Sequence, residues 1–325
     1  MENLLKEIFG GRPAGTILML WGRLKDIFMG GGLSMNKLFA ALLILGQILG
    51  IMTLDIGLKP AGQKLDLDKF SLVWSDEFDG SEIDRNIWDG HYVYGDAAEI
   101  RCGGYWHRSL AHLRDGNLII ETKYLEEGIG GRGPGYYSYG MDTRGRYEQL
   151  YGYFEVRCIF PAAQGLWSAF WMINDNTFNV DGYGRDGTEV DVFESTFYKD
   201  NWWGGGNALV SGIVFDGYGP ESKGTSIGKY RIKGDPYKEF HTYGLEWNPD
   251  EYIFYIDGVE TGRTSYGGVS QNPEWLILSI EVSGKDGVAH SDRHGTGFIE
   301  KNKNWPAEFV VDYVRAYQYK EYLDR

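Results

Sequence analysis

Short apolar segments in which every second residue is hydrophobic recur along most of this chain. Phe154, Val156, Cys158 and Phe160 are an example. Successive side chains of a strand point to opposite faces, so this period places the four residues on one face of a half-buried antiparallel strand. We expect further strands in the similar segments at 70–79, 117–123, 165–173, 189–194, 240–247, 252–256, 275–284 and 309–317.

Turn-forming residues separate these segments. Asp115-Gly116 and Asp257-Gly258 are typical of tight hairpins, and Asn248-Pro249-Asp250 is typical of a turn between two strands. The 325 residues include 47 glycines, with 42% hydrophobic and 15% aromatic residues, which is enough apolar material for one large core. The sequence therefore predicts a single large all-β domain.

The first 57 residues have a different character. Residues 1–34 mix apolar and basic residues, and we interpret them as a cytoplasmic or non-native extension outside the folded domain. Residues 35–57 contain a nearly uncharged run from Leu38 to Leu54, a length between that of a signal peptide and that of a membrane span. The absence of a clear Ala-x-Ala site favours an uncleaved anchor, whereas a start at Met35 favours a signal peptide, and both stay open beside a buried core helix. Either of the first two would place residues 58–325 outside the cytoplasm, in the extracellular space or on the cell surface.

The charge balance limits the partners of the domain. The first 57 residues hold four acids and five bases, which leaves 42 acids and 27 bases in the rest of the chain. An acidic surface repels nucleic acid and disfavours polyanions. A neutral polysaccharide fits this charge better, and nothing in the sequence indicates more than a monomer.

Three carboxylates stand close together in the segment Glu189-Val-Asp-Val-Phe-Glu194. On a regular strand Glu189 and Asp191 share a face, and Glu194 falls on the other. A β-bulge near Val192 or Phe193 would return Glu194 to the side of its partners, and bulges are common beside active sites. Three acids would then line one surface.

Such a row of acids has two interpretations. A solvated strand could carry them, but aligned like charges cost free energy that mixed charges would avoid. Their repulsion also raises the pKa of one carboxyl while another stays ionised, which is the division of roles that glycoside hydrolysis needs. We favour the catalytic interpretation.

The same segment resembles the signature of glycoside hydrolase family 16 in its bulged form, Glu-x-Asp-x-x-Glu. Three further stretches resemble the family pattern in order: Gly152–Arg157, Gly165–Trp171, and Phe240–Trp247 with the later Asp257-Gly258. The resemblance covers roughly 72–319. It implies a concanavalin-like β-sandwich jelly roll of two curved antiparallel sheets, with the acidic strand on a concave face.

The resemblance also implies an activity for residues 58–325. We expect an endo-acting, retaining hydrolase of β-1,3- or mixed β-1,3-1,4-glucan. Glu189 would be the nucleophile, Glu194 the acid that later activates water, and Asp191 a hydrogen-bonding residue between them. The alternatives are a family member or transglycosylase acting on a galactan such as agarose, carrageenan or porphyran, and a non-catalytic carbohydrate-binding module.

Several side chains are candidates for sugar contacts. Trp167 and Trp171 lie an even number of residues apart, so on a strand they face the same way and could form an aromatic floor under a sugar ring. The others are Glu99 and Arg101 in a polar turn, Trp203 in a Gly-rich loop, and Glu281, which shares a strand face with Ser279. Ordinary packing or surface charge is the alternative for each.

No cofactor is expected to be required. By the resemblance, Asp312 would match a residue that often holds a structural Ca²⁺. The run from His290 to His294 is better explained as a solvated loop than as a metal site. Cys102 and Cys158 could form a disulfide or remain two thiols, and the sequence does not decide between them.

Overall fold

The structure is a computed structural model that describes residues 59–88, 96–195, 198, 207–290 and 306–323. The chain divides into two units, residues 1–56 and 57–325. The extension at 1–34 and the hydrophobic segment at 35–57 both lie outside the described residues, so their roles stay predictions. Within the described ranges, no helix has the length and apolar character needed to cross a membrane.

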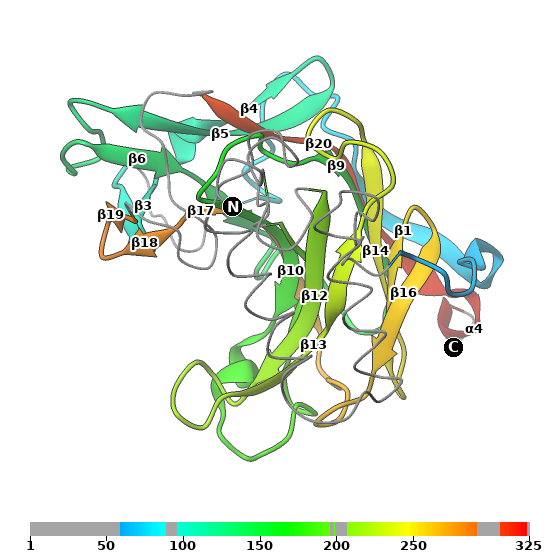
Figure 1. Cartoon of the computed structure of the whole chain (residues 1–325). Coiled ribbons are helices and arrows are strands. Elements are labelled where there is room, and N and C mark those ends of the chain that lie inside the picture. The colour runs from blue at the N-terminus through cyan, green and yellow to red at the C-terminus, as the bar shows by residue number, and fades with distance from the viewer. Residues whose placement is uncertain (1–58, 89–95, 196–197, 199–206, 291–305, 324–325) are drawn as a thin grey trace, which may run out of the picture. The chain divides into compact units, whose positions relative to one another are not determined.

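One layer of the second unit is an eleven-stranded sheet, counted over the described residues (Figure 1). Its strands are β1 (Phe70–Asp76), β2 (Glu99–Arg101), β3 (Gly104–Trp106), β4 (Ala111–Arg114), β5 (Asn117–Leu125), β6 (Gly135–Ser138), β9 (Gly152–Ile159), β14 (His241–Trp247), β15 (Tyr252–Ile256), β16 (Val259–Thr264) and β20 (Ala307–Tyr319). The order is β16-β15-β14-β9-β20-β5-β6-β3-β2, with β1 paired to β20 and β4 paired to β5. The pairing is antiparallel except between β3 and β6.

The second layer is a seven-stranded antiparallel sheet in the same described part of the chain. Its strands are β7 (Gly140–Asp142), β8 (Glu148–Gln149), β10 (Leu166–Ile173), β11 (Glu189–Ser195), β12 (Ala208–Phe215), β13 (Lys223–Arg231) and β17 (Glu274–Val282). The order is β13-β12-β11-β10-β17-β7, with β8 paired to β17. A small hairpin and short helices complete the fold: β18 (Gly284–Lys285), β19 (Val288–Ala289), η1 (Leu67–Lys69), η2 (Arg108–Leu110), η3 (Asp175–Phe178) and α4 (Lys320–Leu323). The predicted all-β sandwich is confirmed.

The main core lies between the two sheets, and strand alternation explains which residues fill it. In β9, Phe154, Val156 and Cys158 are fully buried in a cluster that also takes residues from β10, β11 and β17. Tyr153 points the other way and joins a second cluster with Tyr255. Cys158 and Cys102 both carry free thiols, so the disulfide alternative is not realised.

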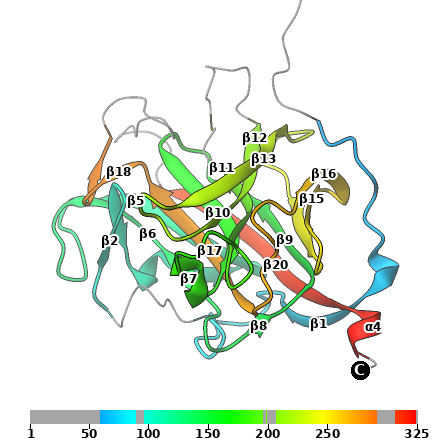
Figure 2. The same ribbon diagram turned by 90° about the horizontal axis from the view of Figure 1, so that it is seen from below.

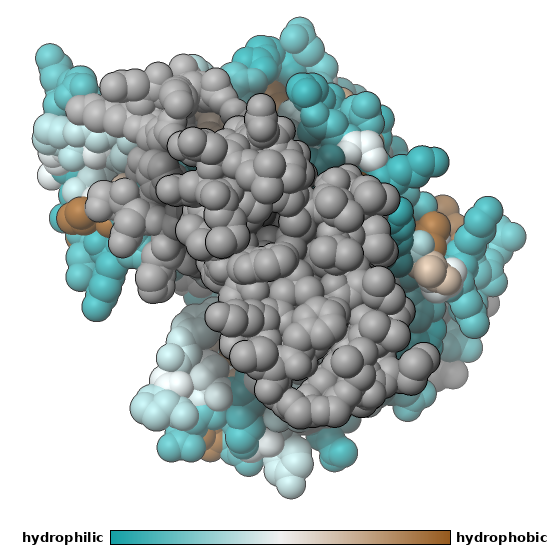
Figure 3. Space-filling model, viewed as in Figure 1, coloured by the Kyte–Doolittle hydropathy of each residue, from teal (hydrophilic) through white to brown (hydrophobic). Residues whose placement is uncertain are grey.

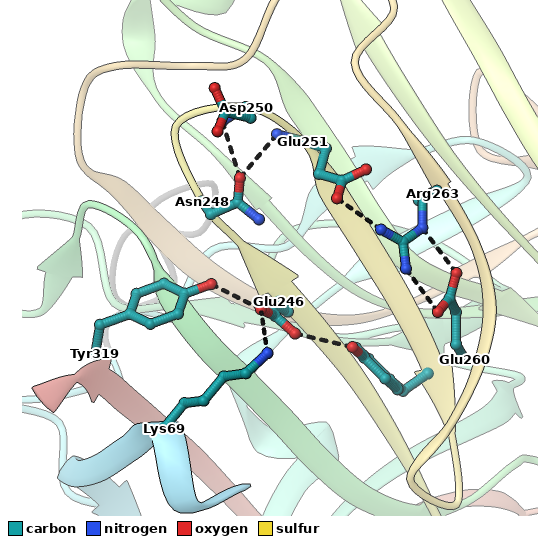
Figure 4. A network of polar contacts seen from close by, with 9 residues as sticks. Lys69, Glu246, Asn248, Asp250, Glu251, Glu260, Arg263 and Tyr319 are labelled. Carbon is teal, nitrogen blue, oxygen red and sulfur yellow. Dashed lines mark hydrogen bonds and ion pairs between the residues drawn. The ribbon is translucent and has the colours of Figure 1, made fainter. Parts of the chain in front are cut away.

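The predicted turn between β14 and β15 is confirmed by its hydrogen bonds (Figure 4). The side-chain oxygen of Asn248 accepts from the backbone N–H groups of Asp250 at 2.9 Å and Glu251 at 3.0 Å. This side chain replaces a backbone acceptor, which is why Asn is favoured at such positions. Arg263, on β16, ties the turn to that strand through an ion pair with Glu251, and it also pairs with Glu260 on its own strand.

Glu246 is a buried acid on the face of β14 that points away from the main core. Its carboxylate accepts hydrogen bonds from the hydroxyls of Tyr255 at 2.8 Å and Tyr319 at 2.9 Å, and Lys69 lies 3.9 Å away (Figure 4). A buried charge is tolerated only with such partners. These bonds connect β14, β15 and β20 on the outer side of the sheet.

The two sheets are joined along one edge, where β17 meets β3 and β6. The carbonyl oxygen of Ile280 accepts from the indole N–H of Trp106 at 2.8 Å and from the hydroxyl of Ser138 at 2.6 Å. The N–H of Gly103 donates to the carbonyl of Val282 at 2.8 Å. These bonds hold the end strands of the first sheet against the second sheet.

The acidic strand β11 lies inside the second sheet, between β10 and β12 (Figure 2). Its Phe193 is fully buried and packs on the rings of Phe160 and Tyr243, each at a centroid distance of 4.8 Å. The strand is therefore fixed to the core from its inner face. On the described surface shown in Figure 3, hydrophilic residues predominate and hydrophobic ones form small separate patches.

We expect Phe193→Ala to lower the free energy of unfolding by about 3–5 kcal/mol, because it leaves a cavity among aromatic rings. Urea denaturation measures this loss. Leu72→Ala removes an apolar side chain that is 52% exposed and should change stability by less than about 0.5 kcal/mol. Equal effects of the two substitutions would contradict the packing described here.

Candidate active site

Strand β11 carries one extra residue relative to the strands that pair with it on either side. The three steps from Asp191 to Glu194 match only two steps along β12, and the pairing with β10 shifts at the same place. Val192 and Phe193 consequently both face the core, where they are 3% and 0% exposed. The bulge predicted near these two residues is confirmed.

The bulge brings the three acids of β11 to one cleft of about 460 Å³, so that Glu189, Asp191 and Glu194 all line it. The other residues of its lining come from both sheets and from the loops between strands. They are Ile100, Arg101, Cys102, Trp167, Ala169, Trp171, Phe178, Tyr218, Ser279 and Glu281. Carboxyl groups, aromatic rings and one guanidinium therefore surround a single cleft.

The two tryptophans of β10 line the cleft in different ways. Trp167 is half-buried and makes a side-chain hydrogen bond with Glu194. Trp171 is 7% exposed, and its indole N–H donates to the hydroxyl of Ser279 at 3.1 Å. Trp167 thus offers more of its ring to a ligand than Trp171 does, although strand parity places both on the cleft face.

Two further aromatic residues in the cleft were missed by sequence reasoning. Tyr218 is 61% exposed, and its hydroxyl donates a hydrogen bond to Glu189. Phe178 is 48% exposed and meets the Tyr218 ring edge-on at a centroid distance of 5.5 Å. The sequence pair Asp216-Gly217 is typical of a turn, but the direction of the next side chain depends on contacts between loops.

Burial raises the pKa of two glutamates in the cleft, Glu189 and Glu194. It brings the pKa of Glu189 to about 7, with smaller contributions from the charges of Glu194 and Glu281, while the hydrogen bond from Tyr218 and nearby Arg101 act in the opposite direction. It also brings the pKa of Glu194 to about 7, against the hydrogen bond with Trp167. Both groups can therefore exchange protons near neutral pH.

Two other acids are more deeply buried. Desolvation and the charges of Glu189 and Glu194 raise the pKa of Asp191 well above its usual range. Glu274, at the start of β17, is fully buried, and desolvation raises its pKa to about 8. Its carboxyl accepts from the backbone N–H of Thr188 at 3.4 Å, and so contacts the residue that precedes Glu189.

Arg101 and Glu281 meet in the cleft. The Arg101 guanidinium forms an ion pair with Glu281 and lies over the ring of Trp106, 4.4 Å from its centroid. The thiol of Cys102 donates to the other Glu281 oxygen at 2.8 Å. Desolvation and the Glu281 charge raise the pKa of this thiol to about 12, so it stays protonated.

Two residues predicted to contact sugars remain, Glu99 and Trp203. Glu99 lies at the start of β2, and it is not among the residues that line the cleft. Trp203 lies outside the described residues. Both assignments stay predictions.

The structure gives Asp312 a partner from the protein itself. Its carboxylate forms an ion pair with Arg157, so the charge that a calcium ion would balance is already met by a guanidinium. Within the described ranges, no cluster of three or more His, Cys, Asp or Glu residues could hold a metal ion. His290 interacts with Ser283 at 3.1 Å, while Asp292 and His294 lie outside the described residues. A calcium site built with other oxygen ligands stays a prediction.

Comparisons with known proteins place this chain in a family. The family model described as "Beta-porphyranase A-D, GH16 domain" matches residues 71–319. A beta-glucanase of Rhodothermus marinus is 30% identical over 270 residues, covering 78% of this chain and 86% of that protein. Beta-porphyranase B of Zobellia galactanivorans is 32% identical over 193 residues, covering 57% of this chain and 64% of that protein.

Some relatives are much longer than this chain, which spans 38% of a glucan endo-1,3-beta-glucosidase A1 from Niallia circulans. The laminarinase structure from Rhodothermus marinus is 28% identical, with a TM-score of 0.58, and covers 77% of this chain and 98% of that chain. The family model spans well over half of the sequence, and the fold agrees with it. This chain therefore belongs to glycoside hydrolase family 16 and is a glycoside hydrolase with a jelly-roll sandwich.

Proposed function

We propose that this chain is an endo-acting, retaining hydrolase of β-linked glucan with β-1,3 or mixed β-1,3-1,4 linkages. The observation that carries the proposal is the bulge of β11, which brings Glu189 and Glu194 into one cleft beside Trp167. Support for the substrate comes from relatives named beta-glucanase, glucan endo-1,3-beta-glucosidase and endo-1,3-1,4-beta-glycanase.

In the first step, a carboxylate oxygen of Glu189 attacks the anomeric carbon. The bond to the leaving oxygen breaks as Glu194 donates its proton to that oxygen. A glycosyl-enzyme ester then links the sugar to Glu189. Glu194 is left as a carboxylate, which is the form needed for the second step.

In the second step, Glu194 removes a proton from water, and the water oxygen attacks the same anomeric carbon. The ester bond breaks, Glu189 leaves as a carboxylate, and Glu194 regains its proton. Two inversions at one carbon give net retention of configuration. The raised pKa of Glu194 suits a group that holds a proton at neutral pH and loses it in the reaction.

Asp191 lies between the two reacting acids in this proposal. Desolvation and the charges of Glu189 and Glu194 raise its pKa strongly and so favour its protonated form, which would avoid a third negative charge on β11. A protonated carboxyl can also donate a hydrogen bond to a charged neighbour. We propose that Asp191 stabilises the ionised form of Glu189 in this way.

We further propose that Trp167 and Trp171 contact the sugar rings and that Arg101 and Glu281 contact sugar hydroxyls. The cleft lining contains four acids and one base, and that base is already paired with Glu281. A strongly anionic polysaccharide would be repelled there. Action outside the cytoplasm on a neutral glucan, as a monomer, is part of the same proposal.

A galactan is the second candidate substrate. The matching family model is named for porphyranases, and the relative named beta-porphyranase B has a higher identity than the relative named beta-glucanase, over a shorter stretch. The paired Arg101 and Glu281 could also serve a galactose unit through its hydroxyls. Product analysis on laminarin, mixed-linkage glucan, agarose and porphyran distinguishes the two candidates, and we expect release of oligosaccharides from the glucans.

Glu189→Gln should reduce turnover on the best glucan by at least about 10⁴-fold, because an amide cannot form the ester. Release of reducing ends measures the loss, and circular dichroism checks that the fold is kept. Glu127→Gln, an exposed control outside the cleft lining, should retain full activity. Near wild-type turnover by Glu189→Gln would disprove the assignment of the nucleophile.

The raised pKa of Glu194 also predicts a pH-dependent stability. A carboxyl whose pKa rises from 4.5 to about 7 on folding binds its proton more tightly in the folded state. The free energy of unfolding therefore falls as pH rises from 4.5 to 7, and it levels off above that range. Glu194→Gln does not undergo this loss, so it should be more stable than the wild type by about 3 kcal/mol at pH 8, with little gain at pH 4.5. Urea denaturation across this range tests the expectation, and a gap that does not change with pH would contradict it.

A further inference from the structure

Tyr218 lies in an exposed loop, and it is one of the described residues that line the cleft. Its hydroxyl reaches a carboxylate of β11. Tyr218 lies between β12 and β13 and donates a hydrogen bond to the Oε2 atom of Glu189. An exposed tyrosine usually keeps its hydroxyl in water. The position of this hydroxyl therefore requires a loop that is held in place.

The loop is held by Asp216, whose carboxyl is buried. Its Oδ1 atom accepts from the backbone N–H groups of Asp181 at 3.2 Å and Gly182 at 3.1 Å, and its Oδ2 atom lies 3.2 Å from the Lys223 ammonium. These contacts fix the Asp216 side chain, and they connect the loop after β12 to the loop after η3. The pKa of Asp216 is lowered by the same partners, despite the opposing effect of burial, so it stays charged.

The backbone beside Tyr218 is shaped for this position. Asp216 and Gly217 have φ values of 62° and 69°, in the left-handed region, and the N–H of Gly217 donates to the carbonyl of Thr177 at 2.8 Å. This turn sends the next side chain over the cleft. The ring of Phe178 then contacts the Tyr218 ring edge-on and limits its rotation.

Glu189 needs a donor because its surroundings are mostly acidic. Tyr218 and Arg101 favour its ionised form, whereas burial and neighbouring acids oppose it. The charged or titratable groups that face it, other than Tyr218, are Asp191 and Glu194 on β11, Glu281 and Glu274 on β17, and Arg101 and Cys102 at the end of β2. Arg101 is shared with Glu281, so Tyr218 supplies a hydrogen bond directly to the Glu189 carboxylate.

We propose that Tyr218 is a positioning residue for hydrolysis, which holds one oxygen of Glu189 so that the other is directed at the anomeric carbon. This inference rests on the proposed role of Glu189 as nucleophile. A sugar bound in the cleft would cover the ring and exclude water from the hydrogen bond, which strengthens it. The bond also keeps Glu189 ionised at a pH where burial alone would protonate it.

Tyr218→Phe removes only the hydroxyl and keeps the ring contact with Phe178. We expect the acid limb of the kcat/KM profile to move up by about 1 pH unit and kcat/KM at pH 5 to fall about 10-fold, with little change in KM. Tyr183→Phe is the matched control, because Tyr183 is 59% exposed on the neighbouring loop and lies outside the cleft lining. It should leave the profile unchanged.

An unchanged acid limb in Tyr218→Phe would overturn the inference. So would a rise in KM alone at every pH, because that result indicates a contact with the sugar and no effect on Glu189. If Glu189→Gln is inactive while Tyr218→Phe is normal, only this inference fails. If Glu189→Gln is active, the proposed function fails as well.

Discussion

Val192 and Phe193 are neighbours on β11, yet both side chains turn into the core, and the position of the acids depends on this arrangement. Strand alternation would send one of the two into the cleft and Glu194 into the core. Burying two apolar side chains contributes about 3–6 kcal/mol, whereas burying an unpaired carboxylate costs several kcal/mol. The extra residue in β11 allows both apolar side chains to be buried without turning Glu194 into the core. Val192 and Phe193 stay in the core, and Glu189, Asp191 and Glu194 share the cleft.

The cleft buries several acidic side chains close together, and burial opposes their ionisation. Burial raises the pKa of Glu189 and Glu194 to near neutrality, which suits proton transfer in the proposed reaction, but it also disfavours the charge that the proposed nucleophile needs. A few donors compensate: Tyr218 for Glu189 and Trp167 for Glu194. The candidate active site thus keeps several buried acids together, with a large aromatic core beneath it.

The sequence predicted the parts of this protein that depend on local periodicity. Alternation identified β9, β11 and β17, and the spacing of Glu189, Asp191 and Glu194 required the bulge that the structure contains. The resemblance to family 16 supplied the sandwich. What could not be predicted depends on contacts between distant segments. Examples are the pairing of Arg101 with Glu281, 180 residues apart, and the hydroxyl of Tyr218 on Glu189, whose placement follows from the buried carboxyl of Asp216.

The hydrogen bonds that join β17 to β3 and β6 have a consequence for self-association. An open sheet edge invites strand addition by another molecule, which leads to aggregation. Around Ile280 the backbone groups are already used, by Trp106 and Ser138 on its carbonyl and by Tyr139 on its N–H. At the opposite end, β13 carries lysines at 223 and 229 and a bulge opposite Ser211, features that discourage docking of a foreign strand. These features limit strand addition at both places, while the cleft stays open to a ligand.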